Sequence, residues 1–81
     1  MGDTHSRESF VGYLAGSLGR EAADGIVVKT CRELKLDPMR FTVESALHAC
    51  ERIAQEPGLV GIAGRFAKMK LILAWGAPKK T

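Results

Sequence analysis

The side chains best suited to metal binding in this 81-residue sequence are two histidines and two cysteines. His5, Cys31, His48 and Cys50 are the whole supply of thiol and imidazole ligands, and their spacing matches no zinc-binding pattern. His48 and Cys50 are two residues apart on an expected helix, so they should point to different sides of it. We therefore expect two buried thiols, two solvated histidines, no metal site and no cofactor.

Nucleophilic catalysis would need a serine or cysteine beside a base. Neither Cys31 nor Cys50 has an evident neighbouring base, and the chain has no Gly-x-Ser-x-Gly elbow. Carboxylates alternate with basic residues, as they do on solvated helices, and no pair is confined to an apolar stretch that would shift its pKa strongly. We predict no catalytic residues and a protein that is not an enzyme.

Positive charge gathers at the C-terminus. Residues 1–64 hold seven basic and nine acidic residues, whereas residues 65–81 hold five basic residues and no acidic one. The five basic residues are Arg65, Lys68, Lys70, Lys79 and Lys80. Such a field attracts an acidic protein partner, or nucleic acid through salt-dependent phosphate contacts, and it also complements the dipole of the last helix.

The elements that must position these side chains are four helices, because apolar residues recur at spacings of three and four and no alternation is long enough for a sheet. The predicted helices span Ser6–Leu18, Arg20–Leu36, Val43–Gln55 and Leu59–Trp75. We predict an all-α fold, a compact bundle of four helices in one domain over residues 1–81, with short flexible ends at about 1–5 and 76–81. A chain this short has a thin core, which dimerisation would complete.

Local signals mark several helix ends. Ser6 and Thr42 are candidate N-caps, and Ser45, three residues after Thr42, is not the glutamate or glutamine of a capping box. Phe41 can pack back on the helix that follows it. Gly12 lies four residues before a second glycine in the first helix, which indicates close approach by another backbone or a weakly held helix.

The last helix has apolar residues on two opposite faces. One face, expected in the core, holds Leu59, Ile62, Phe66, Met69 and Leu73. The other face is expected to need a cover, and it holds Val60, Ala67, Leu71, Ala74 and Trp75. The partner-binding residues that we predict are Val60, Leu71 and Trp75, with Arg65, Lys68 and Lys70 at the rim.

Two further interpretations of this segment remain open. Trp75 can fold back on its own core instead of meeting a partner, and Met69–Trp75 can form a strand that pairs with a symmetry mate. The glycines at 58, 61 and 64 are expected to let the last helix pack closely against its neighbours.

The combined pattern is typical of a small non-catalytic module for protein–protein interaction or regulation, a signalling or adaptor protein that forms a homodimer through its last helix. The alternative is a nucleic-acid-binding protein that contacts phosphates through Arg65, Lys68, Lys70, Lys79 and Lys80. A cytoplasmic location is expected, because the two cysteines form no dense disulfide framework. No membrane association is expected, because the first residues are polar and charges interrupt the longest apolar run.

Overall fold

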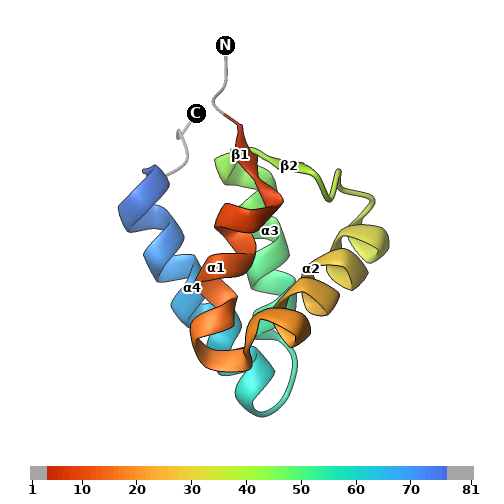
Figure 1. Cartoon of the computed structure of the whole chain (residues 1–81), viewed down its shortest axis with the longest axis vertical. Helices are drawn as coiled ribbons and strands as arrows, with labels where there is room; N and C mark the ends of the chain where they lie inside the picture. Colours follow the sequence, from red (N-terminus) through yellow and green to blue (C-terminus); the bar gives the residue numbers. More distant parts are fainter. Residues whose placement is uncertain (1–3, 77–81) are drawn as a thin grey trace.

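A computed structural model describes residues 4–76 of the chain. In chain order the elements are β1 (His5–Ser6), α1 (Arg7–Leu18), α2 (Arg20–Leu34), β2 (Arg40–Phe41), α3 (Val43–Ala54) and α4 (Leu59–Trp75). The prediction of an all-α bundle of four helices is confirmed: α4 packs on α3 and α1, and α2 packs on α1 and α3 (Figure 1). The basic residues Lys79 and Lys80 lie outside the described residues.

Short polar side chains and left-handed residues set the ends of α1 and α2. Ser6 caps α1 as predicted, since its Oγ accepts a hydrogen bond from the Ser9 backbone N–H at 3.2 Å. Gly19 separates α1 from α2 with a φ of 85°, a conformation that favours glycine. Lys35 also has a positive φ, 59°, so α2 ends at Leu34, two residues earlier than predicted.

A two-residue ladder joins the start of the chain to the segment before α3. β1 and β2 are antiparallel, with His5 opposite Phe41 and Ser6 opposite Arg40. The sequence predicts no strand here, because two residues are too few to show alternation. His5, which the sequence places in a flexible end, belongs to this ladder.

The start of α3 has a capping box that the sequence analysis excluded. Thr42 Oγ1 accepts from the Ser45 backbone N–H, and Ser45 Oγ accepts from the Thr42 backbone N–H, both at 3.0 Å. The serine hydroxyl therefore replaces the usual glutamate or glutamine. Phe41, which the sequence predicts to pack on the helix that follows it, is fully buried, and its ring centroid lies 4.7 Å from that of Phe10 in α1.

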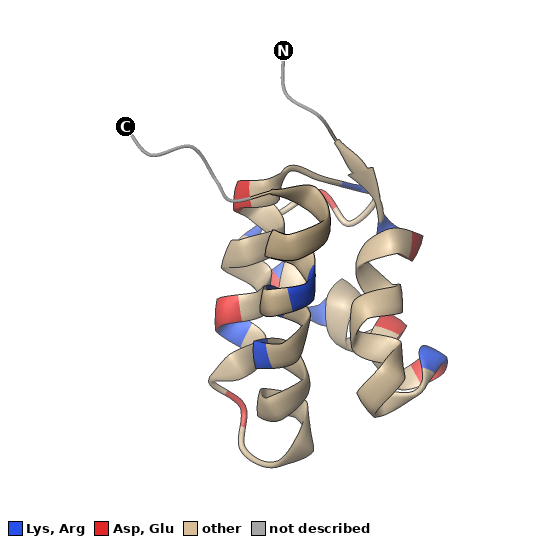
Figure 2. Cartoon of the chain, turned by 90° about the vertical axis from the view of Figure 1, so that its left-hand side faces the viewer, with Lys and Arg blue, Asp and Glu red and all other residues tan. Residues whose placement is uncertain are grey.

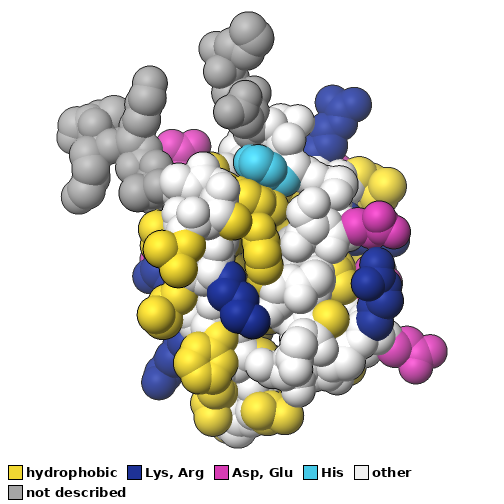
Figure 3. Space-filling model, turned by 60° about the vertical axis from the view of Figure 1, so that its left-hand side comes forward, with side chains coloured by type: hydrophobic (Ala, Val, Ile, Leu, Met, Phe, Trp, Pro, Cys, Tyr) yellow, Lys and Arg dark blue, Asp and Glu magenta, His cyan; other side chains and the backbone are white. Residues whose placement is uncertain are grey.

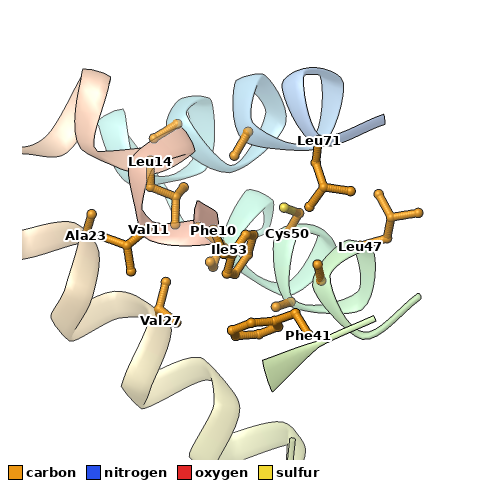
Figure 4. Packing of buried hydrophobic residues seen from close by; sticks show 14 of the residues in the cluster. Phe10, Val11, Leu14, Ala23, Val27, Phe41, Leu47, Cys50, Ile53 and Leu71 are labelled. Atoms are coloured by element: carbon orange, nitrogen blue, oxygen red, sulfur yellow. The ribbon is translucent and has the colours of Figure 1, made fainter. Parts of the chain in front are cut away.

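The core lies between all four helices and also contains the Phe41 side chain of β2. Figure 4 shows how Phe10, Val11 and Leu14 of α1 meet side chains from α2, α3 and α4. The other large buried side chains are Val27, Cys31, Phe41, Leu47, Cys50, Ile53 and Leu71. Both thiols are buried and His48 is exposed, as predicted.

Two glycines let α4 lie directly against α3. A Cβ atom at Gly64 would lie 2.8 Å from the Ala54 backbone nitrogen and 2.9 Å from Ile53 Cγ2. A Cβ atom at Gly61 would overlap the carbonyl oxygen of Glu56. The close packing expected of Gly61 and Gly64 is therefore confirmed, whereas a Cβ atom at Gly58 would meet nothing within 4 Å. α4 is a continuous helix, so the strand alternative for its second half is wrong.

Candidate functional site

α4 has two apolar faces, as predicted, but the structure reverses which of them lies in the core. The buried face consists of Gly61, Ala63, Gly64, Ala67 and Leu71. The face predicted to be buried is exposed, with between 47 and 85% of each side chain open to solvent. This exposed set, which we call the outer stripe, is Leu59, Ile62, Phe66, Met69 and Leu73.

The reversal follows from the distance between helices. The backbones of α3 and α4 approach so closely at Gly61 and Gly64 that the inner face admits little beyond glycine and alanine. The large side chains of the outer stripe then point outward, and Leu71 is the only large side chain on the buried face. Hydrophobic periodicity identifies both apolar faces of α4, but it does not say how near the neighbouring helix lies. In the sequence, the glycines at 61 and 64 indicated which face lies against α3.

The three predicted partner anchors lie toward the chain's own core. Leu71 is 0% exposed, which removes it from any partner-binding surface. Val60 and Trp75 are half-buried and pack against the core. The prediction that these residues form an interface is therefore wrong for Leu71, and the burial of Val60 and Trp75 places most of each side chain against its own subunit.

Trp75 belongs to an aromatic cluster that joins the first and last elements of the described chain. Its ring stacks on His5 with a centroid distance of 3.7 Å and an interplanar angle of 8°. Tyr13 meets it edge-on at 5.7 Å, and the Phe10 ring lies 6.5 Å away. Trp75 thus folds back over the core, and His5 is half-buried rather than fully solvated.

Basic side chains flank the outer stripe, and α4 holds no acidic residue (Figure 2). Lys68 lies on the α3 side, where its Nζ is 3.4 Å from Glu51 Oε2. Lys70 lies on the α1 side, near Gly16. Arg65 is exposed, and it lines a hollow together with Ala54 of α3. Figure 3 shows the hydrophobic side chains over α4 with basic side chains beside them.

The spacing of the outer stripe is that of a helix-packing seam. Its five members follow one another at intervals of three, four, three and four residues, the a and d positions of a heptad. They extend over all but the last two residues of α4, about 21 Å along its axis. Among the described residues, Met39 is the only other large apolar side chain that is strongly exposed.

An open hollow adjoins one end of the stripe. It has a volume of about 310 Å³ and lies at the turn between α3 and α4. Ala54, Pro57, Gly58, Gly61 and Ile62 line it, together with Glu56 and Arg65. Because Ile62 belongs to both features, the hollow is continuous with the outer stripe.

The remaining reactive groups give no second site within residues 4–76. Burial raises the pKa of the Cys50 thiol to about 12, and burial followed by the nearby Asp37 carboxylate raises the pKa of Cys31. Within the same range, no three His, Cys, Asp or Glu side chains lie together as metal ligands would. A second hollow, of about 420 Å³ between α1 and α2, is lined by surface ion pairs such as Arg7–Asp24.

Comparison with protein-family models, with curated proteins and with solved structures finds no significant match to this chain. Among the described helices, none combines the length and apolar character needed to cross a membrane.

Proposed function

We propose that this protein is a non-catalytic interaction module, of the regulatory or adaptor type, that forms a homodimer through the outer stripe of α4. The observation that carries the proposal is the row of five large apolar side chains left open to solvent on one helix face. Exposed apolar rows of this kind mark protein contacts more often than scattered hydrophobic residues do.

The size of the outer stripe supports a protein contact. With about 150 to 200 Å² for a fully exposed side chain of this size, the five side chains present on the order of 500 Å² of apolar surface. A standard interface takes about 800 Å² from each partner, so the stripe and its polar margins are close to the required area. Phe66 lies at the middle of the row, where a buried aromatic contributes most to affinity.

A second copy of the chain can cover the outer stripe, so no other partner protein is needed. Two identical stripes with a and d spacing can pack face to face, and a two-fold symmetric pair buries both at once. Both thiols lie in the core with raised pKa values, which suits a reduced compartment such as the cytoplasm.

The basic residues of α4 give little support to the nucleic-acid alternative. Lys68 already pairs with Glu51, and Arg65 and Lys70 lie on opposite sides of the apolar row. A phosphate backbone that reached both would have to cross Phe66 and its apolar neighbours. The other two basic residues of that proposal, Lys79 and Lys80, lie outside the described residues.

Sedimentation velocity of the purified chain and of two matched variants tests the proposal. The unsubstituted chain should be dimeric at tens of micromolar, and Phe66→Gln should raise the dissociation constant at least tenfold while circular dichroism stays unchanged. Met39→Gln removes an equally exposed apolar side chain outside the stripe and should leave the dimer intact. A chain that stays monomeric at several hundred micromolar would refute the proposal.

A further inference from the structure

The two ends of the outer stripe differ in shape. At the C-terminal end, Leu73 is the most exposed large apolar side chain described, with 85% of its surface open to solvent. At the N-terminal end lies the hollow beside Ile62, whose lining is largely small or apolar. One end of the stripe therefore projects a side chain, and the other end offers a space.

We propose that α4 packs against α4 of a second copy in antiparallel orientation, about a two-fold axis at Phe66, so that Leu73 of each copy enters the hollow of the other. This inference rests on the proposed function and adds the orientation and register of the pair. A two-fold axis repeats every contact of the interface. If Leu73 of one copy enters the hollow of the other, the same contact therefore forms at the opposite end of the pair.

The register follows from the position of Phe66 in the sequence. Phe66 is seven residues from both Leu59 and Leu73, so an antiparallel pair centred on it overlaps the whole stripe. Leu73 of one copy then lies opposite Leu59 of the other, next to the hollow. A parallel pair would instead place Leu73 against Leu73 and would leave the two hollows facing each other.

The helix dipoles favour the same orientation. The dipoles of two adjacent 17-residue helices attract each other when the helices run in opposite directions and repel when they run in the same direction.

Disulfide trapping with single cysteines distinguishes the two orientations. Leu59→Cys and Leu73→Cys lie at exposed positions, and each is purified alone, one with normal and one with heavy isotopes. The variants are oxidised mildly, singly and as a mixture, and the products are weighed by mass spectrometry. The antiparallel pair predicts a mixed disulfide between Leu59→Cys and Leu73→Cys and at least tenfold less of either symmetric disulfide.

The reason is distance, since residues 59 and 73 are about 21 Å apart along one helix and a disulfide needs Cβ atoms about 4 Å apart. The unsubstituted chain is the control, because its own thiols are buried and should form no cross-link. Symmetric cross-linking of Leu73→Cys would show a parallel pair and overturn the inference. A dimer by sedimentation with no cross-link of either kind would overturn the orientation but leave self-association standing, whereas a monomer would remove both.

Discussion

Leu71 and Leu73 are separated by a single residue, yet they lie in opposite environments. Leu71 is enclosed by its own subunit, and Leu73 has the most exposed large apolar side chain of α4. We predict that Leu71→Ala lowers the free energy of unfolding by about 3 kcal/mol, through lost burial and the cavity left behind. Leu73→Ala should change it by less than about 0.5 kcal/mol and weaken dimerisation instead.

Urea unfolding of dilute protein measures the first effect, and sedimentation at higher concentration measures the second. Each leucine serves as the control for the other, because the chemical change is the same. Equal loss of stability in both variants would mean that the inner and outer faces of α4 have been assigned wrongly.

Polar side chains at helix ends were predictable because their hydrogen bonds are local. Ser6 and Thr42 bond to backbone N–H groups three residues away, so a few residues of sequence contain the whole interaction. Ser45 was missed because a serine hydroxyl takes a role that glutamate or glutamine fills in the usual capping box. The stacking of His5 on Trp75 joins residues 70 positions apart, and no local pattern signals it.

At the scale of the elements, substituting alanine for glycine should change the free energy of unfolding in opposite directions at two helix positions. A Cβ at Gly12 of α1 would meet nothing within 4 Å, whereas a Cβ at Gly64 of α4 would meet the α3 backbone. We predict that Gly12→Ala raises the free energy of unfolding by about 0.5 to 1 kcal/mol, because alanine loses less backbone entropy on folding. Gly64→Ala should lower it by about 1 to 3 kcal/mol by forcing α3 and α4 apart.

Thermal or urea unfolding of the two variants beside the unsubstituted chain checks both signs. The sequence suggests close approach by another backbone as one reason for a glycine at position 12. Within the described chain, no atom lies near enough to exclude a side chain there. Stabilisation by Gly64→Ala would contradict the close contact between α3 and α4.

Helix positions were predictable in this chain, and helix orientation was not. The bounds of α4 agree with the prediction because Pro57 and Gly58 precede it and Gly76 ends it. Its inward face depends on how near α3 lies, which is a property of two elements together. The prediction placed the face with the larger side chains, the outer stripe, in the core. The glycines at 61 and 64 indicated instead that their own face lies against α3.

For the whole molecule, charge determines how the proposed dimer should respond to salt. In the antiparallel pair Arg65 lies beside its own counterpart near the two-fold axis, and α4 contributes three basic residues and no acidic one. These like charges repel, and salt screens repulsion over a Debye length of about 10 Å at 0.1 M. We therefore predict that raising sodium chloride from 50 to 500 mM lowers the dimer dissociation constant about two- to fivefold.

Sedimentation equilibrium across this salt range measures the effect, with two variants to locate its source. Arg65→Gln should tighten the dimer at low salt and flatten the salt dependence, because it removes the repelling pair. Arg40→Gln, at an exposed position in β2, carries the same change in charge and should leave the slope as it is. A dimer that weakens as salt rises would be held by attraction between opposite charges and would contradict the prediction.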